Sequence, residues 1–145
     1  LLLGPTVAAM MSHDVTPQRT AVENWIEANT SPDTLIIGHR IWPVRFYTGR
    51  PVLQSGQVAD PSVYDGSRVA AFLHRFGAHF DDAYLLLPDL IPARQRREII
   101  AGYRQAGLAP QPVADIPTRT YDGAREFIMQ VYRVRGGFGN ATPGE

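Results

Sequence analysis

Three residues whose types could do chemistry stand where two apolar runs of the sequence end. His39 and Arg40 close the run TLIIGHR, and Asp89 follows the run AYLLLP. If both runs are parallel strands of one sheet, their carboxyl ends meet at one rim, where open α/β sheets bind ligands. A histidine, an arginine and an aspartate on that rim would form an acid–base or anion-binding site. In the alternative interpretation, these polar residues only mark the points where the chain leaves the core.

A second group of basic residues opens a predicted helix in the stretch PARQRRE. Arg94, Arg96 and Arg97 could bind phosphate, including lipid phosphate, with help from the amino end of that helix. Cations at that end oppose the helix dipole, so the group favours a negative neighbour, which could be Glu98, a partner or lipid phosphate. The alternative is a solvated helix face.

No pattern in the sequence predicts a metal site or a catalytic motif. The chain has no cysteine, which excludes disulfides, zinc–thiolate sites and thiol catalysis. His74 and His79 are five residues apart, so they miss the spacing that places two histidines on one helix face. The serine-hydrolase motif G-x-S-x-G and the nucleotide motifs G-x-G-x-x-G and G-x-x-x-x-G-K-[ST] are missing. We therefore assign no catalytic residue, no metal ligand and no cofactor.

The composition is typical of a globular domain, and it lacks the net positive charge that favours binding to nucleic acid. Hydrophobic residues make up 44% of the 145 residues, and the formal net charge is zero. All 14 basic residues are arginine, which excludes Schiff-base chemistry and Walker-type phosphate binding because both need lysine.

The hydrophobic pattern predicts helices that alternate with strands. Helices are predicted from Thr16-Pro17 to NTSPD, from Trp42-Pro43 to Gly49, from the cap Ser67 to Gly77, and from Pro92 to Gly107. Strands are predicted at TLIIGH, PVLQS, DAYLLLP, PVADI and EFIMQVYRV.

This order of elements predicts a three-layer α/β domain with a small, mainly parallel sheet flanked by helices and an antiparallel hairpin at its C-terminal edge. We expect one domain over residues 16–135 and a flexible tail over residues 136–145. Residues 1–15 form an apolar stub that fits the end of a transmembrane helix.

The stretch RFYTGRPV, residues 45–52, can be interpreted in two ways. As a helix stop, Tyr47 packs and Gly49 supplies the left-handed residue that closes the helix. Arg50 then either pairs with an acid or points at a ligand. As a binding lip, Tyr47 and Arg50 would contact that ligand directly. We favour the helix stop and keep the binding lip as the alternative.

The segments AVENWIEANTSPDTLII, YTGRPV and MQVYRV, taken in this order, resemble the C-terminal extracytoplasmic domain of multi-pass membrane glycosyltransferases of the GT-C class. Protein O-mannosyltransferase-like and aminoarabinose-transferase-like proteins of bacteria belong to this group. The resemblance covers roughly residues 18–135. It also accounts for the apolar start of the chain, which then follows the last membrane helix of a longer protein.

The resemblance implies sugar transfer from a polyprenyl-phosphate-linked donor at the periplasmic face of the bacterial inner membrane. The catalytic carboxylates of such proteins lie in a loop outside this chain, so no catalytic residue is carried over. The implied role is a scaffold or lid, and the implied partners are the membrane-embedded catalytic part of the same polypeptide and the lipid-linked sugar or acceptor.

Two alternative functions remain. One is a self-sufficient α/β enzyme or ligand-binding domain that uses His39, Arg40 and Asp89. The other is an interaction module that binds an anionic partner through Arg94, Arg96 and Arg97.

Overall fold

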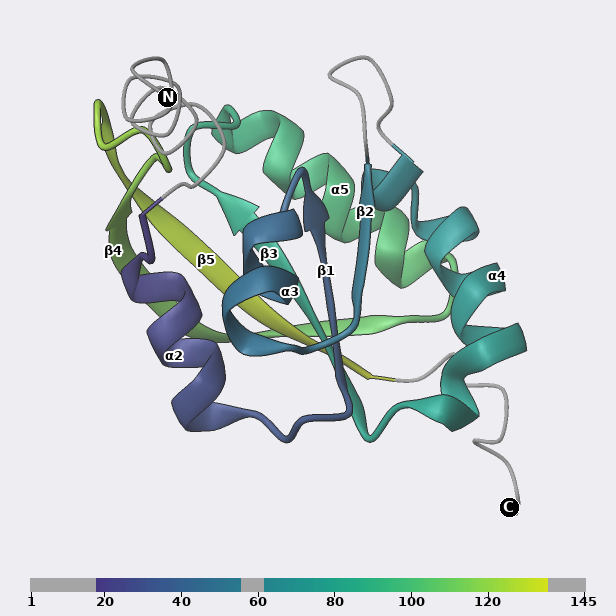
Figure 1. The fold of residues 1–145 in the computed structure, drawn as a ribbon. Coiled ribbons are helices and arrows are strands. Elements are labelled where there is room, and N and C mark those ends of the chain that lie inside the picture. The colour runs from purple at the N-terminus through teal and green to yellow at the C-terminus, as the bar shows by residue number, and fades with distance from the viewer. Residues whose placement is uncertain (1–17, 56–61, 136–145) are drawn as a thin grey trace, which may run out of the picture.

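The computed structural model describes residues 18–55 and 62–135, which form four α-helices, two short 3-10 helices and five strands. Figure 1 shows their arrangement. The helices are α2 (Ala21–Asn29), α3 (Trp42–Thr48), α4 (Gly66–Phe76) and α5 (Ala93–Gln105), with 3-10 turns at Ser62–Tyr64 and Gly77–His79. The strands are β1 (Thr34–His39), β2 (Val52–Ser55), β3 (Asp82–Pro88), β4 (Ala109–Arg119) and β5 (Glu126–Arg135).

The five strands form one mixed sheet in the order β2-β1-β3-β5-β4. Strand β1 is parallel to both β2 and β3, whereas β5 is antiparallel to both β3 and β4. The α/β class, the parallel arrangement of β2, β1 and β3 and the antiparallel C-terminal hairpin are confirmed, and the sheet as a whole is mixed. The apolar content of β3 indicates burial on both faces and says nothing about the direction of its neighbour.

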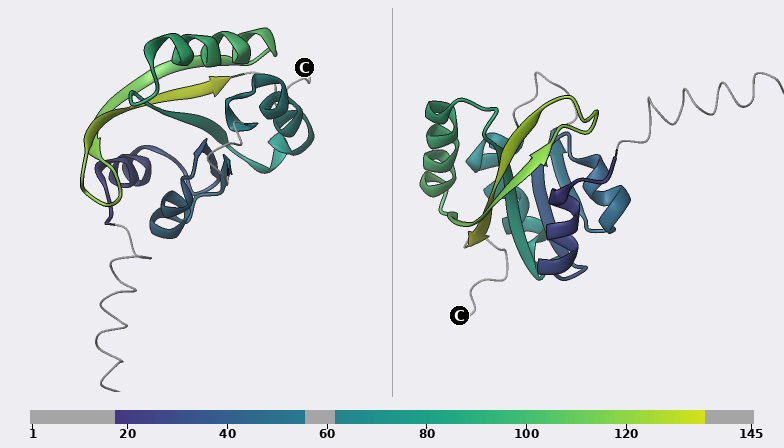
Figure 2. Two further views of the ribbon diagram at one scale, coloured as in Figure 1. Left: turned by 90° about the horizontal axis from the view of Figure 1, so that it is seen from above. Right: turned by 90° about the vertical axis from the view of Figure 1, so that its left-hand side faces the viewer.

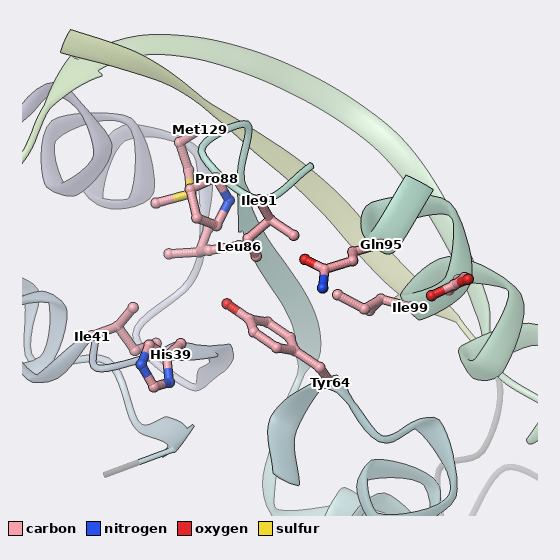
Figure 3. Close-up of a pocket in the computed structure, with 10 residues that line it drawn as sticks. His39, Ile41, Tyr64, Leu86, Pro88, Ile91, Gln95, Ile99 and Met129 are labelled. Carbon is pink, nitrogen blue, oxygen red and sulfur yellow. The ribbon is translucent and has the colours of Figure 1, made fainter. Parts of the chain in front are cut away.

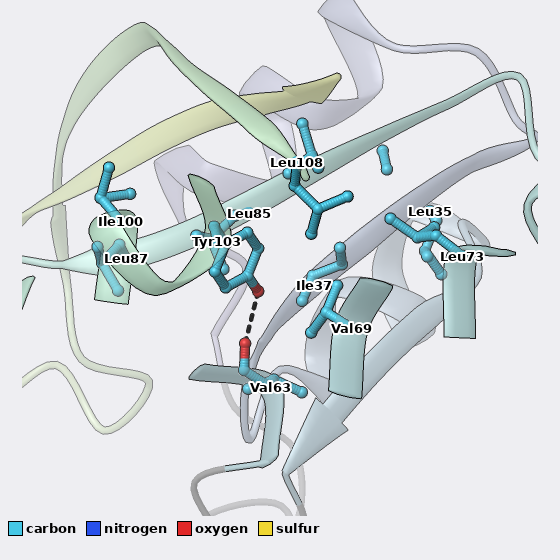
Figure 4. Close-up of a cluster of buried hydrophobic side chains, with 12 residues drawn as sticks. Leu35, Ile37, Val63, Val69, Leu73, Leu85, Leu87, Ile100, Tyr103 and Leu108 are labelled. Atoms are coloured by element: carbon cyan, nitrogen blue, oxygen red, sulfur yellow. Dashed lines mark hydrogen bonds between the residues drawn. The ribbon is translucent and has the colours of Figure 1, made fainter. Parts of the chain in front are cut away.

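Helices cover both faces of the sheet, and each face has its own apolar core. On one face, α4 and α5 pack over Leu35, Ile37 and Leu85, and the buried hydroxyl of Tyr103 donates to the carbonyl oxygen of Val63 at 2.5 Å. Figure 4 shows this cluster. On the other face, α2 and α3 pack over alternate residues of the same strands. The two views in Figure 2 show the sheet between the helix pairs.

The helix caps differ from the predicted ones in two places. Helix α2 begins at Ala21, where Thr20 and Glu23 form a capping box; Thr16 and Pro17 lie outside the described residues. Helix α4 is capped by Asp65 and not by Ser67, because the Asp65 side chain accepts from the backbone of Ser67. Gly49 ends α3 in the left-handed conformation with φ of 72°, as predicted.

Strand β4 is longer than predicted although it contains Pro110, Pro112 and Pro117. It lies at the edge of the sheet, where a proline can occupy the side of the strand that has no neighbouring strand to hydrogen-bond with. The register shifts between Pro112 and Ala114, which marks a bulge in the same segment.

In the described part of the chain, no helix combines the length and apolar character needed to cross a membrane. The predicted apolar stub (residues 1–15) and the predicted tail (residues 136–145) lie outside that part.

Candidate functional site

The strand order creates a crevice between β1 and β3. The chain leaves β1 through α3 on one face, and it leaves β3 toward α5 on the other face. Adjacent parallel strands whose connections diverge in this way form a topological switch point, and ligands of open α/β sheets bind at such points, outside the carboxyl ends of the strands.

A cavity of about 610 Å³ lies at this switch point, within the range typical of small-molecule sites. Its walls combine aliphatic side chains with a few hydrogen-bonding groups, and Figure 3 shows how they lie. The polar groups are His39, Tyr64, Gln95 and Glu98, and the apolar ones are Ile41, Leu86, Pro88, Ile91, Ile99 and Met129.

Three of the polar side chains come from three different elements. His39 ends β1, Tyr64 ends the 3-10 turn before α4, and Gln95 lies in the first turns of α5. The rings of His39 and Tyr64 are 6.2 Å apart between centroids, and Gln95 projects toward them from α5 (Figure 3). A hydroxyl, an imidazole and an amide against an aliphatic wall suit a small amphipathic molecule that accepts and donates hydrogen bonds.

Burial raises the pKa of the Tyr64 hydroxyl to about 12, whereas tyrosine in an unfolded chain ionises near pH 10. The folded state therefore keeps its proton while the unfolded state loses its own, and stability is lost as the pH rises above 10. At pH 11 we expect Tyr64 to lower the free energy of unfolding by about 1.4 kcal/mol relative to pH 8. Urea denaturation of the wild type and Tyr64→Phe at both pH values measures this, and the variant should lose that part of the decrease. An identical decrease in both proteins would contradict the assignment.

The structure gives the side chains of His39, Arg40 and Asp89 different contacts at the rim. His39 lines the cavity, whereas the Asp89 carboxylate accepts from the backbone nitrogen of Ile128 at 3.0 Å and so fixes the end of β3 to β5. Arg40 is exposed and lines, together with His39, a smaller hollow of about 190 Å³ on the α2 side of the rim. It has φ of 53°, unusual for a residue other than glycine, and its backbone nitrogen donates to the carbonyl oxygen of Ser55.

The three arginines of α5 also differ in their contacts. Arg96 donates to the carbonyl oxygen of Ile91 at 2.8 Å and to the side chain of Gln130 at 3.0 Å, which holds the start of α5 on β5. Arg94 forms an exposed ion pair with Glu98 at 3.5 Å, and Glu98 is one of the three negative neighbours that the sequence suggested. Arg97 is exposed. Whether any of them binds an anion stays a prediction.

Within residues 18–55 and 62–135, Arg50 forms no ion pair with an acid, and it is not among the residues that line the cavity. It is 8% exposed, and its guanidinium donates to the carbonyl oxygens of Thr30 at 2.6 Å, Thr48 at 3.0 Å and Glu27 at 3.5 Å. Two of these carbonyls lie at the carboxyl end of α2, where a cation is favoured by the helix dipole. Tyr47 is half-buried, and Arg19 lies over its ring.

Among residues 18–55 and 62–135, no three His, Asp or Glu side chains gather as a metal site would require. His74 and His79 are exposed on α4 and on the following 3-10 turn.

Sequence reasoning missed Tyr64, Gln95 and Glu98. Gln95, Glu98 and Ile99 stand three and four residues apart, so a helical face was readable from the sequence, but nothing showed that this face meets the rim. Tyr64 lies in a 3-10 turn whose position depends on contacts far along the chain, because the carbonyl of its neighbour Val63 binds Tyr103.

Comparison of the chain with protein-family models, with curated proteins and with solved structures finds no match. The resemblance to GT-C glycosyltransferases therefore rests on the motifs alone and stays a prediction.

Proposed function

We propose that this chain is a non-catalytic extracytoplasmic domain of a membrane glycosyltransferase of the GT-C class. It would act as a scaffold or lid for the membrane-embedded active site of the same polypeptide, which takes its sugar from a polyprenyl-phosphate donor at the periplasmic face. The support comes from the motifs WIEANTSPD and YTGRPV and from the way the fold joins them.

One side chain carries the argument. Arg50 belongs to YTGRPV, and it binds backbone carbonyls of Glu27 and Thr30, which belong to WIEANTSPD. Thr30 also takes part through its side chain, which accepts from Arg50 Nε at 3.3 Å. Two short motifs that meet through a buried arginine form one structural unit. Their joint presence is therefore more specific to a family than either motif alone.

Fractionation of cells of the source organism tests the proposal. An antibody raised against this domain should detect a band far larger than the 16.0 kDa of this chain, in the membrane pellet and extracted only by detergent. Serum that has been absorbed with the purified domain is the control. A native band of 16.0 kDa in the soluble fraction would overturn the proposal.

The second candidate function is a small-molecule-binding domain or enzyme that works by itself. The cavity at the switch point favours it, because its volume and its mixed lining suit a ligand. The same fractionation separates the two candidates, since a soluble 16.0 kDa product would direct attention to His39, Tyr64 and Gln95.

A further inference from the structure

Helix α3 exposes two large aromatic side chains, although it is only seven residues long. Trp42 is 45% exposed and Phe46 is 63% exposed, while Val44 on the opposite side is buried in the core. These two rings and that of the half-buried Tyr47 form one continuous group, with centroids 6.1 Å apart between Trp42 and Phe46 and 4.9 Å apart between Phe46 and Tyr47. We call Trp42, Arg45 and Phe46 the aromatic face of α3. Apolar side chains that are exposed next to each other, and not scattered singly, are typical of surfaces that contact another surface.

The stretch of sequence that carries the aromatic face has charged residues of one sign only. Residues 34–59 contain no Asp or Glu, and the exposed Arg40 and Arg45 form no ion pair within the described part of the chain. The nearest ion pair, Arg19 with Glu27, is already balanced. A surface that complements this face must therefore offer both an apolar layer that can bury the rings and negative charge. A bilayer with anionic headgroups has both.

The described chain begins beside this face. Arg19 lies over the ring of Tyr47 at 5.9 Å from its centroid and donates to the Tyr47 carbonyl oxygen at 3.4 Å. Both views of Figure 2 place α3 and the purple start of the chain on the same side of the domain. The start of the described chain and α3 therefore lie next to each other.

We propose that the aromatic face of α3 docks onto the surface of an anionic bilayer. Trp42 and Phe46 enter the boundary between headgroups and acyl chains, where aromatic rings are favoured, and Arg40 and Arg45 bind lipid phosphates. The inference extends the proposed function and rests on it for the nearness of the membrane. Binding to lipid can nevertheless be measured on this chain without reference to any parent protein.

The test uses the whole 145-residue chain and vesicles of phosphatidylcholine with or without phosphatidylglycerol. We expect Trp42→Ser/Phe46→Ser to reduce the partition coefficient into phosphatidylglycerol vesicles roughly tenfold, since two exposed aromatic side chains lose their apolar burial. Arg45→Gln should reduce it about fivefold, and only when phosphatidylglycerol is present. Phe76→Ser is the matched control, because Phe76 is also exposed, at 38%, beside an arginine, but lies on α4. It should bind like the wild type.

A second measurement separates this face from the apolar residues 1–11, which all variants share. In Trp25→Phe, Trp42 is the only tryptophan, and lipids with brominated acyl chains should quench its fluorescence. A bound chain whose Trp42 is not quenched would overturn the proposal, even if every variant sediments with vesicles. A concentration-dependent dimer that Trp42→Ser/Phe46→Ser abolishes, without any effect on vesicles, would assign the face to a second copy and also overturn it. The fractionation result reports on the parent protein, so failure of either idea can be told from failure of the other.

Discussion

Replacing Arg50 with methionine should lower the free energy of unfolding by about 3 kcal/mol or more. Methionine keeps much of the side-chain volume but provides no donor for the carbonyl oxygens of Glu27, Thr30 and Thr48. Removing a buried ion pair can be harmless when both partners are replaced by apolar groups. Here the acceptors are backbone carbonyls, which no side-chain substitution removes. Each carbonyl that loses its donor lowers the stability of the folded state because it is left without a hydrogen bond.

The linkage of two segments makes the effect large. Arg50 fixes the carboxyl end of α2 to the loop after α3, and the backbone nitrogen of Arg50 itself donates to the side chain of Thr48 at 3.2 Å. Arg50→Lys should give an intermediate loss, because a single ammonium group cannot span acceptors that the planar guanidinium binds together.

Urea denaturation measures these changes against Arg97→Met, which replaces an exposed arginine of α5 in the same way. The control should stay within about 0.5 kcal/mol of the wild type. If Arg50→Met is as stable as the control, Arg50 has no structural role. The alternative that it contacts a ligand would then gain weight, and the joint-motif argument for the proposed function would be lost.

The order of elements was readable from the sequence because local signals and burial agree there. TLIIGH and DAYLLLP became the central strands β1 and β3, and Gly49 ends α3 in the conformation that glycine favours. The direction of β5 beside β3 was not readable. It depends on where the hairpin returns after α5, which is a matter of packing between distant segments.

The cavity was only half predictable for the same reason. The rule for strand ends predicted His39 at the rim, where it lines the cavity, but it could not show that the Asp89 carboxylate accepts from the backbone nitrogen of Ile128. The residues that complete the cavity come from α5 and from the turn that ends at Tyr64. Their distance from β1 is set by how closely α4 approaches α5, and no local sequence pattern specifies it.

That approach depends on Gly66, and Gly66→Ala should lower the free energy of unfolding by at least about 3 kcal/mol. A Cβ atom at this position would lie 2.4 Å from the carbonyl oxygen of Gly102 and 2.7 Å from the Cα atom of Tyr103. Both are backbone atoms of α5, so no side-chain rotation can relieve the overlap, and the two helices must move apart. Tyr103 would then be drawn from the carbonyl of Val63, and the cavity between Tyr64 and α5 would widen.

Gly102→Ala is the matched control, because Gly102 lies directly opposite Gly66 yet has open space where its own Cβ would stand. It occupies the interior of α5, where alanine is favoured over glycine by about 0.5–1 kcal/mol, so this variant should be slightly more stable than the wild type. Thermal and urea denaturation of the two single variants thus compare one added methyl group on each side of the same helix contact. If both variants shift stability in the same direction, the close approach of α4 and α5 is not as the structure describes it. Opposite shifts would show that the geometry of this contact, and not a general intolerance of larger residues, limits how closely α4 and α5 pack.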